Sequence, residues 1–222
     1  MTTLAMPKPR RDGGIEDMTA KWYAANTADM MKEYVQLAQR ISGQLPQGSA
    51  VLEVAPGPGY LCIELAKRGS YAITGLDISR TFVKMAAKKA AEAGVEVAFK
   101  QGTASNLPFP GDIFDFLVCR AAFKNFAEPV LALKEMCRVL RPGGRALIID
   151  LRRDASPEVV SRYVDGMGLS KVNRILTRLI FRLILLKRAY TGEQFRLMLA
   201  QTRFSKVEVT EAEIGLEISM TK

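Results

Sequence analysis

Short apolar segments alternate with helical patterns through the middle of the chain. Five runs have the length and composition of buried strands: 50–54, 71–76, 95–100, 113–119 and 146–150. Between them, apolar residues recur three or four positions apart, as on one face of a helix, over 60–67, 81–93 and 129–139. Strands that alternate with helices build βαβ units, so the pattern predicts an α/β fold with a parallel sheet.

The last part of the chain departs from this rhythm. Residues 205–210 and 214–220 alternate apolar and polar side chains, which predicts an antiparallel hairpin with one half-buried face. Arg141-Pro142-Gly143-Gly144 predicts the turn before the fifth strand, with Pro fixing φ and both glycines supplying positive φ. Ser156-Pro157 begins a helix, and Thr191-Gly192-Glu193-Gln194 has the spacing of a capping box at the start of another.

The predicted elements leave room for one domain. We expect residues 1–14, rich in Pro, Gly and basic residues, to be a flexible tail, and 15–222 to be a single domain. Within it, 15–45 forms N-terminal cap helices, and 151–190 is an insert that forms a lid over a substrate site. The first residues lack the apolar segment of a signal peptide, so the expected location is the cytoplasm.

The insert carries most of the excess positive charge. Residues 151–190 hold nine Lys and Arg against three Asp and Glu, a net charge of +6 out of +9 for the chain. Within 171–190, Arg174, Arg178 and Arg182 are spaced four apart between apolar residues, which predicts an amphipathic helix too short and too charged to span a bilayer. Three interpretations stay open: an apolar side that covers a core or cavity while the arginines are solvated, a contact with anionic lipid, or a nucleic-acid face.

Composition limits the available chemistry. The chain of 222 residues contains no histidine, which excludes His-based general bases, Ser-His and Cys-His nucleophile pairs, and metal sites that need imidazole. The three cysteines, Cys62, Cys119 and Cys137, lie in apolar stretches at unrelated spacings, so neither a disulfide framework nor a metal site is expected. Any catalysis must use other groups.

A glycine-bearing loop follows the first predicted strand. Glu53-Val54-Ala55-Pro56-Gly57-Pro58-Gly59 runs into a helix, an arrangement that lets the backbone approach a ligand closely. Asp77 ends the second strand, eighteen residues after Gly59, where a carboxylate suits ribose hydroxyls. Glu53 beside the loop would repel a pyrophosphate and attract an ammonium or sulfonium group. The loop therefore favours a nucleoside that carries positive charge over a dinucleotide.

Five motifs in this order resemble the class I S-adenosylmethionine-dependent methyltransferases that act on small molecules. They are Val51–Gly59, Leu76-Asp77-Ile78-Ser79, Gly102–Phe109, Phe114-Asp115-Phe116 and Val139–Gly144. The resemblance covers the chain from about Trp22 onward. It implies a Rossmann-like sheet of seven strands, parallel except for an antiparallel last strand, with helices on both faces. S-adenosylmethionine would bind over the carboxyl ends of the first strands, without a metal.

The resemblance also assigns cofactor-binding residues. Glu53, Ala55, Pro56, Gly57 and Gly59 would cradle the methionine part, with Arg120 near it; Asp77 would hold both ribose hydroxyls; Ile78 would pack on the adenine; and Thr103 and Ala104 would border the adenine amino group. Two positions depart from the family pattern. Ala55 replaces a usual Gly, which we expect to be tolerated with negative φ, and Thr103 replaces a usual Asp and would accept a weaker hydrogen bond.

Candidate catalytic residues follow the fourth strand and lie in the cap helices. Lys124 and Asn125 stand where relatives often carry a His pair, and Lys124 would act as a base only if burial lowered its pKa. Otherwise Lys124 would orient an anionic acceptor. Arg120 is a further catalytic candidate, and the Tyr23 hydroxyl would reach the site from the cap helices, unless that ring only packs under them. Because methyl transfer is an in-line displacement, alignment alone can supply much of the catalysis.

The leading hypothesis is a methyltransferase for a small apolar or anionic acceptor. A second hypothesis adds peripheral membrane contact through 171–190 to reach a lipid or quinone. A third is a protein that binds S-adenosylmethionine without methylating and uses the basic helix for a partner, and the same helix could form a homodimer. The Asn/Asp-Pro-Pro-Tyr/Phe signature of enzymes that methylate nucleic-acid amino groups is absent after the fourth strand. Its absence argues against adenine N-methylation but not against other RNA targets, and a nucleic-acid partner is not the expected one.

Overall fold

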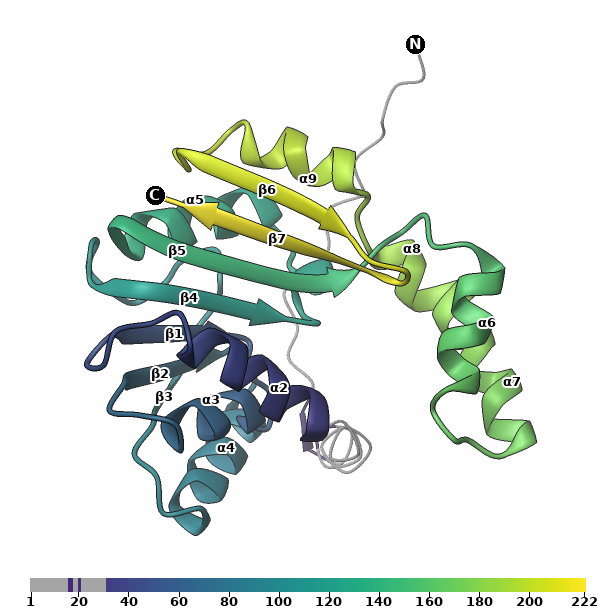
Figure 1. Ribbon diagram of the computed structural model, residues 1–222, viewed down its shortest axis with the longest axis horizontal. Coiled ribbons are helices and arrows are strands. Elements are labelled where there is room, and N and C mark those ends of the chain that lie inside the picture. Colours follow the sequence, from purple (N-terminus) through teal and green to yellow (C-terminus); the bar gives the residue numbers. More distant parts are fainter. Residues whose placement is uncertain (1–15, 18–19, 21–30) are drawn as a thin grey trace.

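A seven-stranded sheet forms the centre of the protein. The computed structural model describes residues 16–17, 20 and 31–222. The sheet has the order β3-β2-β1-β4-β5-β7-β6 (Figure 1). Its strands are β1 Ala50–Val54, β2 Ala72–Asp77, β3 Ala98–Gln101, β4 Phe114–Arg120, β5 Leu140–Leu151, β6 Lys206–Glu211 and β7 Gly215–Thr221. Every pairing is parallel except those of β7, which runs antiparallel to both β5 and β6. The predicted sheet and hairpin are confirmed.

Helices cover both faces of this sheet, as expected. The described helices are α2 Met31–Ser42, α3 Tyr60–Ala66, α4 Arg80–Glu92, α5 Pro129–Val139, α6 Pro157–Asp165, α7 Lys171–Ile180, α8 Leu186–Arg188 and α9 Gly192–Leu199, with a 3₁₀ turn η2 at Phe123–Asn125 and a π turn η3 at Phe181–Leu185. Helices α2, α3 and α4 lie on one face, and α5 and α9 on the other (Figure 1).

Alternation along the strands produces two cores. In β4, Leu117 and Cys119 pack with α5 and α9, whereas Phe116 and Val118 pack with α2 and α3. Successive side chains of a strand point to opposite faces, so a strand covered on both sides reads as a continuous apolar run. This double coverage explains why the strand segments were recognisable from hydrophobicity.

The predicted helix caps at Ser156 and Thr191 are confirmed, whereas the predicted turn before the fifth strand differs from the structure in two respects. Ser156 caps α6 by accepting from the Val159 amide, and Thr191 forms a complete capping box with Gln194 at α9. Arg141-Pro142-Gly143-Gly144, predicted as the turn before the fifth strand, lies within β5, where the register with β4 shifts, and only Gly143 of its two glycines has positive φ, at 77°. The expectation of positive φ at Gly144 is wrong. That residue is glycine for space, because a Cβ there would lie 2.8 Å from the Arg141 carbonyl oxygen.

The insert between β5 and α9 projects from the end of the sheet at which β4 and β5 finish (Figure 1). Its helices α6 to α8 form a small separate core around Val160, Val164, Phe181 and Leu186. The first of the three interpretations, an apolar side that covers a core, holds only for Phe181 and Leu186, because the apolar residues of α7 are exposed and Arg174 and Arg178 form ion pairs with Asp165 of α6. In the described part of the chain, no helix is both long and apolar enough to cross a membrane.

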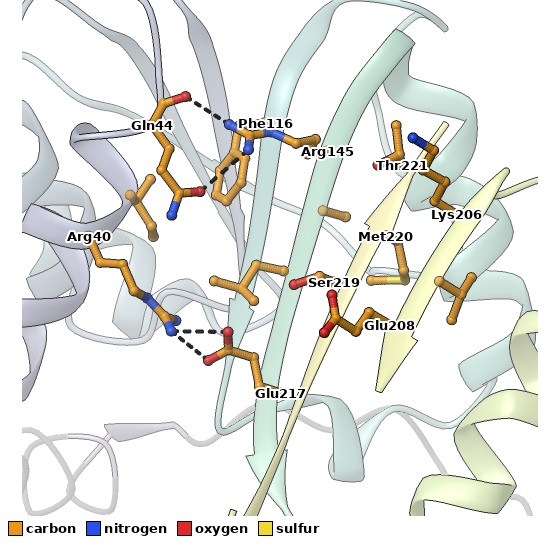
Figure 2. A pocket seen from close by; sticks show the side chains of 14 residues that line it. Arg40, Gln44, Phe116, Arg145, Lys206, Glu208, Glu217, Ser219, Met220 and Thr221 are labelled. Carbon is orange, nitrogen blue, oxygen red and sulfur yellow. Dashed lines mark hydrogen bonds and ion pairs between the residues drawn. The ribbon is translucent and has the colours of Figure 1, made fainter. Parts of the chain in front are cut away.

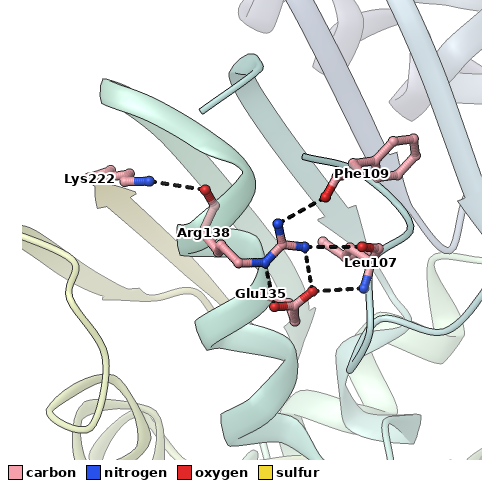
Figure 3. Close-up of polar contacts among 5 residues, drawn as sticks. All are labelled: Leu107, Phe109, Glu135, Arg138 and Lys222. Carbon is pink, nitrogen blue, oxygen red and sulfur yellow. Dashed lines mark hydrogen bonds and ion pairs between the residues drawn. The ribbon is translucent and has the colours of Figure 1, made fainter. Parts of the chain in front are cut away.

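A polar clamp from α5 holds the loop that joins β3 to β4. Glu135 accepts a hydrogen bond from the Leu107 amide at 2.9 Å, and Arg138 donates to the carbonyl oxygens of Phe109 and Leu107 at 2.9 and 3.1 Å (Figure 3). Lys222 in turn donates to the Arg138 carbonyl oxygen at 3.1 Å. The loop carries Thr103 and Ala104, so the clamp fixes the backbone next to the expected adenine site.

Arg138→Met is expected to lower the free energy of unfolding by about 2 kcal/mol, because it leaves two loop carbonyl oxygens and the Glu135 carboxylate without their donor. Urea denaturation measures this change. Lys134→Met on the exposed side of the same helix is the control, and should change stability by less than about 0.5 kcal/mol. Equal effects of the two substitutions would contradict the role of the clamp.

Candidate functional site

The carboxyl ends of β1 and β4 define the site by topology. These strands are neighbours, yet β1 leads into α3 on one face and β4 leads through η2 into α5 on the other. The connections therefore diverge at this end of the sheet, and at such a topological switch point open α/β sheets bind ligands in a crevice. Both connections begin with an alanine in the left-handed region, Ala55 at φ 59° and Ala121 at φ 57°.

Ala55 corrects the expectation of negative φ. The left-handed conformation is fixed because the Ala55 amide donates to the Leu76 carbonyl oxygen at 2.7 Å, which turns the chain sharply out of β1. Left-handed backbone costs a residue with a Cβ about 1–2 kcal/mol. Strain of this kind collects at binding and catalytic sites, where the surrounding structure enforces it.

The rest of the loop places backbone amides at the same edge. Gly57 has φ 54°, and its amide donates to Asp77 Oδ2 at 3.0 Å, so the loop is tied to the end of β2. Gly59 at φ 81° begins α3 and lies so close to α4 that a Cβ would come 2.8 Å from the Ala86 Cβ. Pro56 is buried beside them. The glycines let the loop lie flat against β2 and α4.

Asp77 is the acid best placed for a ligand with hydroxyl groups. Its side chain is buried, and Oδ1 accepts from the Ser79 amide at 2.9 Å while Oδ2 accepts from Gly57. Burial raises the pKa of Asp77, and the two backbone hydrogen bonds offset part of that rise. Each carboxylate oxygen can accept a further hydrogen bond, so the fixed side chain can still receive two donors.

Glu53 is a second buried acid at the end of β1. Its carboxyl group accepts a hydrogen bond from the Cys62 thiol of α3 at 2.9 Å. Burial raises the pKa of Glu53 to about 7, although the Cys62 hydrogen bond and the positive charge of Arg120 act in the opposite direction. Near neutral pH this carboxyl group can therefore exchange its proton for a bound cation.

Arg120 at the end of β4 is held by α2. Its guanidinium group donates to Glu33 at 2.5 Å and lies 4.3 Å from the centre of the Tyr34 ring. Planar guanidinium groups stack on aromatic rings while still donating at their edges, so Arg120 remains able to orient an anionic group. Contact with α2 links the cap helices to the site.

The Lys124 side chain is more buried than we expect of a residue that contacts a substrate. Its ammonium group forms an ion pair with Asp150 at the end of β5, with Nζ 2.8 Å from Oδ1, and also donates to the Ala121 carbonyl oxygen. The Lys124 amide donates to the other oxygen of Asp150 at 2.8 Å. The pair joins the connections after β4 and β5, an arrangement typical of a positioning role; a catalytic role for Lys124 stays a prediction.

The expected adenine side is formed by the ends of β2 and β3. Ile78 is half-buried, Ala104 is buried, and Thr103 makes a hydroxyl contact of 3.1 Å with Ser105. The Thr103 oxygen also accepts weakly from the Ser105 amide at 3.4 Å. The Thr103 hydroxyl is thus oriented by contacts within its own loop. Its contact with an adenine amino group stays a prediction.

Sequence reasoning missed two residues near this end of the sheet, and one predicted residue is not tested. Glu16 accepts from the Arg80 and Thr81 amides, both at 3.1 Å, and so caps α4 beside Asp77. Tyr163 of α6 lies near Arg120 and Glu33; its pKa is raised by burial first and then by the charge of Glu33. No periodicity marks such contacts between distant segments. Tyr23 lies outside the described residues.

The donor set fits S-adenosylmethionine on structural grounds. The buried carboxyl groups of Glu53 and Asp77 lie at the ends of adjacent strands, and the pKa of Glu53 is about 7. The loop 55–59, with three residues at positive φ, follows Glu53. Carboxylates attract ammonium and sulfonium groups and accept from ribose hydroxyls, whereas they repel a pyrophosphate. Within residues 16–17, 20 and 31–222, no group of three His, Cys, Asp or Glu side chains gathers to hold a metal ion.

A separate groove of about 430 Å³ lies on the sheet between α2 and the C-terminal hairpin (Figure 2). Two of its charged side chains are already paired: Arg40 bonds Glu217 at 2.8 Å, and Arg145 donates to the Gln44 carbonyl oxygen at 2.8 Å. None of the expected cofactor residues lines it. The topological crevice at the carboxyl ends of β1 and β4 is therefore the stronger candidate.

Comparison with known proteins identifies the family of this chain. A family model described as a methyltransferase domain matches residues 52–148. Demethylmenaquinone methyltransferase of Mycobacterium tuberculosis is 33% identical over 183 residues, which cover 80% of this chain and 75% of that protein. The uncharacterized methyltransferase YcgJ of Bacillus subtilis is 40% identical over 119 residues, 53% of this chain and 46% of that protein. The chain spans a little under half the length of several such relatives.

The fold has a solved counterpart across nearly its whole length. The crystal structure of a candidate S-adenosyl-L-methionine-dependent methyltransferase from Methanococcus maripaludis superposes with a TM-score of 0.73 at 20% identity, covering 96% of each chain. At that identity the likeness concerns the fold. Sequence and fold thus point to the same family.

Lys124→Met is expected to lower the free energy of unfolding by about 3–5 kcal/mol, because it leaves the Asp150 carboxylate buried without a counter-charge. The double variant Lys124→Met/Asp150→Asn removes both charges and should recover about half of this loss. Urea denaturation of the three proteins measures the coupling. If the double variant were no more stable than the single one, the ion pair would not have the structural role described.

Ala55→Gly is expected to raise the free energy of unfolding by about 0.5–1 kcal/mol, because relief of left-handed strain exceeds the greater freedom of Gly in the unfolded chain. Ala87→Gly on the exposed side of α4 is the matched control and should lower stability by about 1 kcal/mol. Thermal and urea unfolding give both values. A loss in both variants would show that position 55 carries no strain.

Proposed function

Because the chain belongs to the S-adenosylmethionine-dependent methyltransferases, we propose that it transfers a methyl group from S-adenosylmethionine to a small apolar or anionic acceptor. The observation that carries the proposal is the pair of buried acids, Glu53 and Asp77, on either side of the strained loop at the end of β1. Bound S-adenosylmethionine supplies an electrophilic methyl group on a sulfonium centre and is left as S-adenosylhomocysteine.

Each residue of the crevice has a binding role in this proposal. Asp77 would accept from the two ribose hydroxyls, with its orientation set by the Ser79 and Gly57 amides. Glu53 would face the positively charged methionine end once it has lost its proton. Ile78 and Ala104 would pack on the adenine, and Thr103 would border its amino group. The protein thereby orients the donor before the acceptor arrives.

Catalysis would depend on alignment more than on a protein base. Lys124 has its ammonium group in an ion pair with Asp150, so it is better suited to hold the β4 connection in place. Arg120 is the cation at the mouth of the crevice, where it would orient an acceptor that is already ionised, such as a phenolate or thiolate. Such an acceptor needs no proton removed before its electron pair forms the new bond to the methyl carbon.

In this proposal the insert forms the side of the site that binds the methyl acceptor. Its aromatic side chains favour an apolar substrate. Tyr163 of α6 lies toward Arg120 and packs its ring on Phe181 at 5.7 Å. One related protein is named a demethylmenaquinone methyltransferase, and a ring with an ionisable hydroxyl matches an aromatic and cationic pocket. We propose a quinol or phenol as the acceptor class, with 151–190 as the lid over it.

The first test is calorimetric titration of S-adenosylmethionine and S-adenosylhomocysteine into the wild type and Asp77→Ala. Loss of the ribose acceptor should weaken binding by about 1.5–3 kcal/mol, the usual value of hydrogen bonds to a charged group. Asp112→Ala, in an exposed loop, is the control and should bind as the wild type does. If the wild type binds neither compound, the sequence motifs have only a structural role and the proposed function is wrong. Binding without turnover across a panel of phenols, quinols and thiols would favour a non-catalytic protein.

Glu53 predicts how binding depends on pH. With its pKa at about 7 in the cofactor-free protein, Glu53 is mostly protonated below that pH and ionised above it. Affinity for the cationic donor should therefore rise about tenfold between about pH 6 and pH 8, with proton release on binding. Titrations in buffers of different ionisation enthalpy measure both. Glu53→Gln should flatten the profile, and an unchanged slope in that variant would assign the titration to another group.

A further inference from the structure

The helix of residues 171–188 presents an apolar face to the outside of the molecule. Val172, Ile175, Leu176 and Leu183 are 75%, 60%, 55% and 58% exposed, and Leu179, Ile180 and Ile184 are exposed beside them. Positions 172, 175, 176, 179 and 183 recur at helical spacing and therefore share one face. Single exposed leucines are ordinary, but seven large apolar residues on one projecting helix mark an interaction surface. We call these seven residues the apolar face.

The orientation of this helix is fixed from its other side. Phe181 and Leu186 are buried against Val160 and Val164 of α6; Phe181 begins the π turn η3, and Leu186 follows it. Arg178 donates to Asp165 at 2.6 Å on the same side. The contacts that could have buried the apolar face are thus made by other residues, so the face is held outward.

The same helix carries exposed positive charge and no acid of its own. In α6, a hydrogen bond with Ser156 lowers the pKa of the Glu158 carboxyl group, and Arg182 lies close enough to lower it further. Lys171, Arg182, Lys187 and Arg188 are exposed, and the sequence contains no Asp or Glu between Asp165 and Glu193. A second copy packed on this face would bring two cationic helices together, which Coulomb repulsion disfavours. A nucleic acid would have to cover a surface whose centre is leucine and isoleucine and has no stacking ring. An anionic lipid surface matches both features, because it accepts apolar side chains and attracts cations.

We propose that the helix of residues 171–188 docks the protein on anionic membranes, with the apolar face in the acyl region and its cations at the lipid headgroups. The insert projects from the edge of the sheet that carries the crevice (Figure 1). An apolar acceptor dissolved in the bilayer would then reach Tyr163 and Arg120 without crossing water. That last step rests on the proposed methyl transfer, whereas the docking itself does not.

Flotation of the full chain with vesicles tests the docking. Vesicles of phosphatidylcholine with about 30% phosphatidylglycerol should bind the protein at low salt, and binding should weaken at least tenfold for phosphatidylcholine alone or at high salt. Equal binding to both vesicle types, or to neither, would overturn the proposal.

Substitution of the apolar face separates burial from charge. Leu176→Ser/Leu179→Ser/Leu183→Ser should reduce vesicle binding by about tenfold for each leucine removed. The matched control, Leu131→Ser/Leu197→Ser/Val207→Ser, removes exposed apolar side chains from other elements and should bind vesicles as the wild type does. Loss of binding in both triple variants would show that the effect is not specific to the helix.

Substitution of the cations tests the lipid headgroup contact. Arg182→Gln/Lys187→Gln/Arg188→Gln should weaken binding about fivefold for each cation, on the order of 100-fold for three. Lys84→Gln/Lys88→Gln/Lys134→Gln changes the net charge equally at exposed positions outside the insert, and should have an effect of less than about fivefold. Equal losses in the two variants would indicate attraction by net charge alone.

A probe on the helix reports its depth directly. The native cysteines are buried, so a nitrobenzoxadiazole label on Leu179→Cys reads one position. Its emission should shift to the blue with anionic vesicles and be quenched by brominated lipid, while the same label on Leu197→Cys should not respond. Sedimentation that showed a dimer lost in the leucine variant, without vesicle binding, would assign the face to a second copy. S-adenosylmethionine titration of every variant separates failure of docking from failure of the cofactor site.

Discussion

The divergence of β1 and β4 is the constraint from which the site follows. Two adjacent parallel strands must deliver the chain to opposite faces of the sheet within a few residues. Ala55 and Ala121 absorb this change of direction with left-handed backbone, and each amide is held by a carbonyl oxygen of a neighbouring strand, Leu76 and Ile149. The strain is therefore local and enforced by the sheet, and the crevice remains open because neither connection can cross it.

Electrostatics at this edge follow from the same geometry. Strand ends at a crevice are covered by loops, so Glu53 and Asp77 are removed from water although they carry ionisable groups. Asp77 is compensated by backbone amides, and Glu53 only by the Cys62 thiol and the charge of Arg120. Lys124 and Asp150 are also buried, and each charge is compensated by the other in an ion pair. One acid is thus left poised for an external cation while the other charges are satisfied within the protein.

Much of the fold could be predicted because its signals are local. Strands such as 113–119 are covered on both faces and read as apolar runs, and Ser156 and Thr191 cap their helices from within a few residues. Signals that depend on distant segments were not available. The outward direction of Leu176 follows from the contact of Arg178 with Asp165 in another helix, and the φ of Ala55 follows from Leu76 in another strand. The spacing of apolar residues predicted the amphipathic helix, but its packing against other helices decides which side of it is buried.

The position of β7 has a consequence for how the chain folds. β7 follows β6 along the chain but lies between β5 and β6, where it pairs with both. Until β7 has been synthesised, β5 is therefore an unpaired edge with an apolar segment from Ala146 to Ile149. Strands β1 to β5 can pair with one another before β7 exists, but β6 can join the sheet only through β7. A nascent chain that pauses before residue 215 would expose this edge to other chains and to chaperones.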